Sequence, residues 1–166
     1  GAYTAVEGEK TIMREGDFVI TPSWAWHDHG NESDEPMVWL DGLDIPITQL
    51  FDASFAEPLG ADSQMLARPI GDSLARYGEG LLPVDCSSRL TSPIFNYSYA
   101  RTRKALTTLA SNSGPDPSHG IRLKYVNPVT GGYALPTIAT FMQFLPARFS
   151  GETYRSTDAT VFSVVE

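Results

Sequence analysis

The stretch that most constrains the fold is GDFVITPSWAWHDHGN, which runs from Gly16 to Asn31. A glycine turn opens it, a short apolar strand follows, and Pro22 ends that strand because proline has no N–H to donate to a ladder. Two of the three histidines of the chain, His27 and His29, then stand two positions apart. In an extended segment this spacing puts both side chains on one face. The pattern predicts a strand that displays two imidazoles together.

The same residues resemble the second conserved motif of cupin barrels. Gly16, Pro22, His27 and Asn31 stand at the positions of that motif. In cupins the histidine in this register is one of the metal ligands, so the resemblance implies that His27 binds metal. The remaining ligands in that family are an earlier His-x-His pair and sometimes a glutamate. The alternative is a structural histidine that meets its hydrogen bonds within the strand.

Longer blocks narrow the resemblance. The histidine block is followed by DEPMVWLDGLD from Asp34, by KYVNPVTGG from Lys124 and by LPTI from Leu135. In this order the blocks resemble the gentisate 1,2-dioxygenases, bicupin ring-cleaving enzymes related to salicylate and 1-hydroxy-2-naphthoate dioxygenases. The resemblance implies a mainly β cupin fold, a double-stranded β-helix or jelly-roll barrel. It also implies that the chain is a bicupin fragment with some helix in the inter-cupin segment.

The resemblance further implies a division of the chain. Residues 1–52 are expected to form the C-terminal part of the first cupin barrel, 53–132 an inter-cupin linker segment with a short helix, and 133–166 the start of the second barrel. The His-x-His pair of the first barrel would then precede this chain. Tyr154 and Ser156 stand where the second barrel would carry its pair, and a phenol and a hydroxyl make a poor ferrous site.

Local patterns give expected elements. Strands are expected at 2–6, 11–13, 18–21 and 37–43, from 141 onward, and at 160–165. Pro46 at a first helical position predicts a short helix. A second helix is expected to begin at Ser98 or Asn96 and to run to about Ala110. Residues 53–80 are expected to be a turn-rich linker.

His29 and Asp41 are the candidate catalytic residues. In gentisate-type enzymes the second histidine of this block contacts substrate or handles protons, so the resemblance implies that role for His29. An imidazole can act as an acid or a base near neutral pH. Asp41 is expected inside an apolar strand, where a carboxylate needs a partner. The resemblance makes it a pocket residue that orients a histidine or the substrate. For both residues the alternative is a structural hydrogen bond.

The resemblance therefore implies a non-haem Fe(II) extradiol-type dioxygenase that opens gentisate (2,5-dihydroxybenzoate) with O2 to maleylpyruvate in aromatic catabolism. Fe(II) is the implied cofactor, a small aromatic acid and O2 are the implied partners, and a homo-oligomer is the implied assembly. Salicylate or 1-hydroxy-2-naphthoate cleavage is an alternative, because a few pocket side chains decide between such substrates. A cupin that only binds a ligand is another. The fragment alone is expected to be inactive.

Composition argues against other partners. The net charge is −8, with no basic cluster beyond residues 101–104, which argues against nucleic acid and anionic membranes. No apolar run approaches the about 18 residues of a membrane span. The lone Cys86 excludes an intrachain disulfide framework and suits a reducing cytoplasm, where we expect the protein to act.

Overall fold

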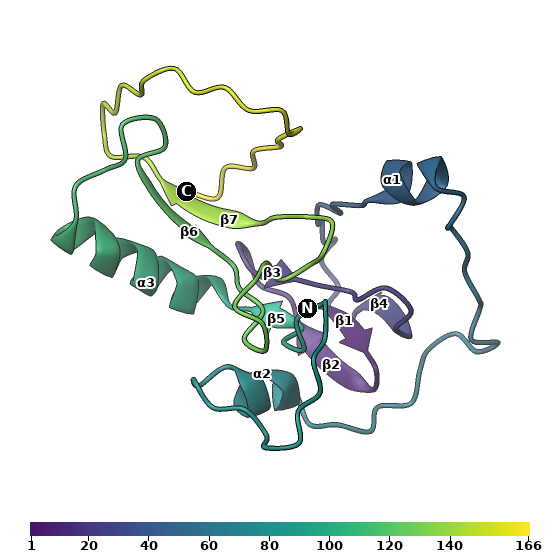
Figure 1. Ribbon diagram of the computed structural model, residues 1–166. Coiled ribbons are helices and arrows are strands. Elements are labelled where there is room, and N and C mark those ends of the chain that lie inside the picture. The colour runs from purple at the N-terminus through teal and green to yellow at the C-terminus, as the bar shows by residue number, and fades with distance from the viewer.

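The computed structural model describes residues 1–166 and contains seven strands and three helices. The elements are β1 (Ala2–Val6), β2 (Glu9–Ile12), β3 (Phe18–Val19), β4 (His27–Asn31), α1 (Ile45–Leu50), α2 (Asp72–Tyr77), β5 (Asn96–Tyr97), α3 (Tyr99–Asn112), β6 (Ile121–Lys124) and β7 (Phe141–Phe144). The strands form a sheet in the order β2-β1-β4 and the pairs β3-β5 and β6-β7. Helix α3 lies beside β6 and β7, whereas α1 stands apart on a long connection (Figure 1).

The central strand of the three-stranded sheet is β1, which is antiparallel to both neighbours. The hairpin between β1 and β2 turns at Glu7 and Gly8, whose φ angles are 49° and 80°. Two successive positive φ values are typical of the tight turns that match the twist of paired strands. A side chain at Gly8 would also lie 3.3 Å from the carbonyl oxygen of Met65, so this position favours glycine.

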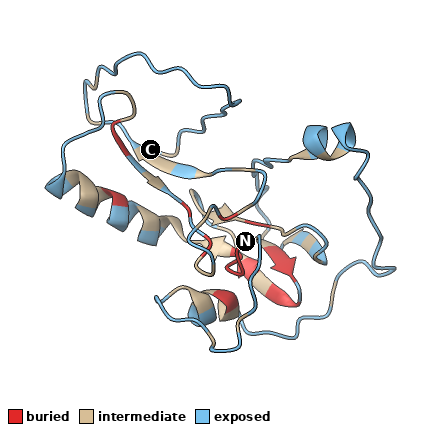
Figure 2. Ribbon diagram, viewed as in Figure 1, coloured by how far each residue is buried: buried red, intermediate tan, exposed pale blue.

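The buried core extends from β1 past the β3-β5 pair to the place where α3 packs against β6. Its apolar members are Ala2, Ala5, Val6, Ile20, Ile94, Phe95, Leu106, Ile121, Tyr125 and Ala134. An aromatic group formed by Phe18, Tyr97 and Tyr125 joins the β3-β5 pair to the end of β6, with ring centroids 4.8 to 5.7 Å apart. Figure 2 shows burial concentrated on β1 and β2, while the long connections are exposed. The histidine strand β4 is thus held by a well-buried neighbour.

Helix α3 begins where the sequence predicts it. Ser98 occupies the N-cap position, yet its side chain makes no capping hydrogen bond. Instead Asp17, which precedes β3, accepts the N–H of Tyr99 at 2.8 Å. A carboxylate at the start of a helix also interacts favourably with the helix dipole. The expected helix is confirmed, with its capping acceptor supplied from a distant turn.

Two strand predictions are wrong. Residues 37–43 and 160–165 contain no strand, and Val38, Val161 and Val164 are 84 to 95% exposed. A β-branched or aromatic run becomes a strand only when a neighbouring strand accepts its hydrogen bonds, and neither segment has one in this chain. The linker prediction for 53–80 missed helix α2. No helix of the structure has both the length and the apolar character that crossing a membrane requires.

Candidate active site

Strand β4 brings His27 and His29 to one face, as the sequence predicts. Their ring centroids lie 5.8 Å apart, and both residues are exposed. Asp28 points the other way, where its Oδ2 accepts the backbone N–H of Gln64 at 3.1 Å. Gln64 also donates through its amide to the carbonyl of Ala5 at 3.1 Å. The face of β4 that carries Asp28 is therefore bonded to the connection that contains Gln64. The face that carries the two imidazoles remains open.

The hydrogen bond of His27 fixes which ring nitrogen is available. Nδ1 lies 3.0 Å from the carbonyl oxygen of Ala25. A carbonyl can only accept, so we assign the proton to Nδ1, which leaves the lone pair on Nε2. Histidines that bind metals typically donate their other N–H to a carbonyl or carboxylate in this way. The local geometry fits His27 as a single metal ligand.

His29 is oriented by a residue that the sequence alone did not reveal. Its Nδ1 lies 2.9 Å from Oγ1 of Thr4, which is only 1% exposed. The Thr4 hydroxyl is also 3.3 Å from Sδ of Met13. The ring of Trp39 approaches His29 from the 37–43 segment, with centroids 5.7 Å apart. Nε2 of His29 has no partner in the chain, so it is free to exchange a proton with a bound molecule.

Asp41 does not lie as expected. It is exposed, in a segment without secondary structure, so the premise of a carboxylate inside an apolar strand is wrong. It has no hydrogen bond or ion pair in the chain. The nearby carboxylate that is bonded belongs to Asp44, whose Oδ2 accepts from the Thr137 hydroxyl at 2.6 Å. The structure brings Trp39 to His29, whereas Asp41 makes no hydrogen bond to either histidine.

Tyr154 and Ser156, which stand at the positions of a second histidine pair, make contacts unlike those of His27 and His29. Tyr154 packs edge-on against His119, with ring centroids 4.4 Å apart. The hydroxyl of Ser156 donates to Asp158. His119 in turn places Nδ1 3.0 Å from Oδ1 of Asp116. Nowhere in residues 1–166 do three His, Cys, Asp or Glu side chains lie close enough together to hold a metal ion.

Comparison with known proteins gives the relationship. A family model described as a cupin domain matches residues 1–43. Over the whole chain, 59% of residues are identical to Gentisate 1,2 dioxygenase 1 of Aquipseudomonas alcaligenes, 48% of whose length is covered. The chain is a homologue of gentisate 1,2-dioxygenase, and its first 43 residues match the cupin domain. This confirms the predicted resemblance and fold class.

Other relatives of this dioxygenase homologue agree. A 1-hydroxy-2-naphthoate 1,2-dioxygenase of Nocardioides sp. (strain KP7) is 35% identical over 99% of the chain, which covers 42% of that protein. A variant of the salicylate 1,2-dioxygenase of Pseudoaminobacter salicylatoxidans, solved with gentisate, has a TM-score of 0.75 and 34% identity. That match covers 85% of this chain and 41% of the solved one. The chain spans about half the length of the curated relatives it matches.

Proposed function

We propose that the protein carrying this chain is a gentisate 1,2-dioxygenase, which opens gentisate with O2 to maleylpyruvate. The observation that carries the proposal is the 59% identity along the whole chain to a gentisate enzyme, against 35% to the naphthoate enzyme. Salicylate and 1-hydroxy-2-naphthoate are the competing substrates. A related salicylate enzyme was solved with gentisate, which supports a small aromatic acid as the ligand class.

His27 would provide one ligand to Fe(II). Imidazole suits iron, and the proton on Nδ1 leaves Nε2 as the donor. Because residues 1–166 hold no group of three ligating side chains, two further donors would come from elsewhere in the protein. When bound, the iron supplies positive charge that attracts the carboxylate and phenol oxygens of the substrate, and the redox chemistry that O2 requires. The chain alone should therefore be inactive.

His29 would handle the proton of the substrate phenol. Its Nε2 is free, and Thr4 holds the ring through Nδ1, so the exchanging nitrogen keeps one orientation. An imidazole so placed can take up the phenol proton as substrate binds and return it to the opened product. Trp39 would add an apolar wall beside the same ring. Asp41 is proposed as a pocket residue on the resemblance alone, because it has no bonded partner in the chain.

The remaining assignments also rest on the resemblance. Tyr154 and Ser156 would leave the second cupin without iron, since both side chains are already engaged within the chain. We propose that the barrels divide at 1–52, 53–132 and 133–166, that the protein is a homo-oligomer, and that it acts in the cytoplasm.

The test uses the whole protein that carries this chain. Iron analysis should give about one iron per subunit, and a ferrous chelator should abolish turnover. Gentisate, salicylate and 1-hydroxy-2-naphthoate are then compared by kcat/KM, and gentisate should give the highest value. A preference for either other acid would contradict the substrate assignment. Saturable gentisate binding without iron or turnover would favour a cupin that only binds.

A further inference from the structure

A second, separate feature is a polar pocket of about 110 Å³ beside helix α2. Three of its eight lining residues are arginines, namely Arg68, Arg76 and Arg89. Helix α2 is bonded to β2, whereas the histidines lie on β4, at the opposite edge of the three-stranded sheet. A single water needs about 10 to 15 Å³ of such space, so the pocket has room for a small polyatomic ion.

The charges around the pocket do not cancel. Asp72 is the one lining carboxylate, and its Oδ2 accepts from Nε of Arg76 at 2.9 Å. That contact leaves both terminal nitrogens of Arg76 available. Arg68 and Arg89 belong to none of the ion pairs of the chain. Even with the nearby Glu9 counted beside Asp72, three arginines face two carboxylates, in a chain whose net charge is −8.

Each arginine is set on a segment that the fold anchors. The backbone N–H of Arg68 donates to the carbonyl of Gly8 at 3.0 Å. The carbonyl of Arg89 accepts from the side-chain amide of Asn127 at 2.8 Å. The guanidinium groups therefore start from fixed backbone positions on separate segments, which reduces the ordering cost of closing them around a ligand.

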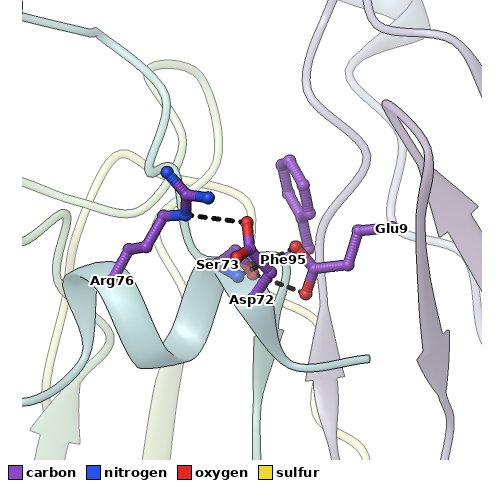
Figure 3. A network of polar contacts seen from close by, with 5 residues as sticks. All are labelled: Glu9, Asp72, Ser73, Arg76 and Phe95. Carbon is purple, nitrogen blue, oxygen red and sulfur yellow. Dashed lines mark hydrogen bonds and ion pairs between the residues drawn. The ribbon is translucent and has the colours of Figure 1, made fainter. Parts of the chain in front are cut away.

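Helix α2, which carries Arg76, is anchored by a buried carboxylate (Figure 3). Glu9 on β2 is 1% exposed and accepts both the N–H and the O–H of Ser73, each at 2.9 Å. Ser73 Oγ also accepts the N–H of Phe95 at 3.3 Å. Ser73 thus engages both oxygens of Glu9, and Arg68 and Arg76 lie near enough to this carboxylate to interact with its charge.

We propose that this pocket binds a compact, doubly charged oxyanion such as phosphate or a small dicarboxylate. Guanidinium groups bind phosphate and carboxylate through paired N–H donors, and neither Arg68 nor Arg89 forms an ion pair within the chain. The site is distinct from the imidazole face of β4. Its occupation does not depend on the dioxygenase activity.

The test is calorimetric titration of the whole protein with inorganic phosphate and, separately, with malonate. Saturable binding of either ion is expected, weakened by added salt. Arg89→Gln should weaken it at least about tenfold, because one charge-assisted hydrogen bond is worth about 1.5 kcal/mol or more. Arg68→Gln should act in the same direction, and iron content and gentisate turnover should be unchanged in both variants.

Arg103→Gln is the matched control, because Arg103 is exposed on α3 and pairs with Glu166 outside the pocket. Binding in this variant should equal wild type. Thermal unfolding of each variant checks that the fold is intact. The proposal is overturned if neither ion binds wild type saturably, if Arg89→Gln binds as wild type does, or if Arg103→Gln weakens binding equally. The ion that binds more tightly shows whether the site takes a phosphate or a small dicarboxylate.

Discussion

The hydroxyl oxygen of Thr4 lies 2.9 Å from Nδ1 of His29, and the two residues are direct partners in the antiparallel pair of β1 and β4. Cross-strand partners place their side chains on the same face of a sheet. The position of the imidazole is therefore fixed by a buried strand as well as by its own. Thr4 thus positions His29 from β1, and the pair can be tested as a unit.

His29→Ala should retain iron in the whole protein and lose on the order of 10²-fold or more in kcat, because it removes the proposed proton-transfer group. Thr4→Val should retain iron and lose about tenfold in kcat, since the ring stays but its hydrogen bond is lost. Iron analysis beside steady-state kinetics on gentisate measures both effects.

Thr11→Val is the control for Thr4→Val, because Thr11 pairs with Thr4 on β2, is buried, and makes no side-chain hydrogen bond. Its kcat should stay near wild type. Equal losses in the two threonine variants would remove the positioning role. If His29→Ala loses iron as completely as a His27 variant does, His29 is a ligand instead.

Asp41→Asn should have a smaller effect than His29→Ala. The residue is exposed in this chain and is hydrogen-bonded to neither histidine, so any contribution would come through pocket geometry. We expect a change mainly in kcat/KM, with iron content unchanged. Kinetics on gentisate for the variant measure it, with Asp34→Asn, also exposed, as the control. A loss as large as that of His29→Ala would mean that Asp41 acts directly on the reaction.

Asp17→Ala should destabilise the protein by about 1 to 2 kcal/mol, the usual cost of losing a helix cap. Asp17 accepts the N–H of Tyr99 at 2.8 Å and, through Oδ2, the N–H of Arg14 at 3.1 Å. The midpoint of thermal unfolding should fall accordingly. Glu15→Ala, at an exposed neighbouring position, should leave it unchanged. An unchanged midpoint in Asp17→Ala would mean that α3 begins equally well without this acceptor.

Glu9 makes stability depend on pH. Burial raises the pKa of Glu9 above its ordinary value of 4.5, despite the hydrogen bonds from Ser73 that lower it. Between the unfolded and folded pKa values the folded protein binds more protons. The Glu9 contribution to the free energy of unfolding is therefore complete below the unfolded pKa and is lost as pH rises through the folded pKa.

In Glu9→Gln the side chain cannot ionise. The free energy of unfolding of this variant should therefore lack the fall with rising pH that Glu9 causes in wild type. Urea unfolding of both proteins over a pH series measures it. The free energy of unfolding of wild type minus that of the variant should fall as pH rises. Glu15→Gln controls for the loss of one carboxylate. If wild type instead gains stability relative to the variant as pH rises, the folded state favours the charged form of Glu9.

Local patterns predicted the elements that local chemistry determines. The first two strands lie near the predicted 2–6 and 11–13, Pro46 stands in the first turn of α1, and alternation places His27 and His29 together. The missing information is non-local. The contact of Thr4 with His29 joins residues 25 positions apart, and it depends on which strands pair.

Strand predictions that rested on composition alone were wrong where a strand needs a neighbouring strand to pair with. Residues 160–165 have high β propensity, but without a neighbouring strand they remain an exposed extended segment. Residues 37–43 fail for the same reason, and that error misplaced Asp41. Helix α2 was missed because six residues between glycines give little periodicity, and the contacts of Ser73 with Glu9 that hold it come from elsewhere in the chain. The roles of His27, His29 and Asp41 stay predictions.

The iron content of His27→Ala in the whole protein tests the central claim most directly. His27 has the free Nε2 of a metal-binding histidine, so removing it should abolish iron retention and gentisate turnover together. His119→Ala is the control, because His119 is paired with Asp116 away from β4 and should keep wild-type iron. Elemental analysis decides between the outcomes. Loss of iron in the His27 variant alone is the predicted result, and undiminished iron in that variant would contradict the account.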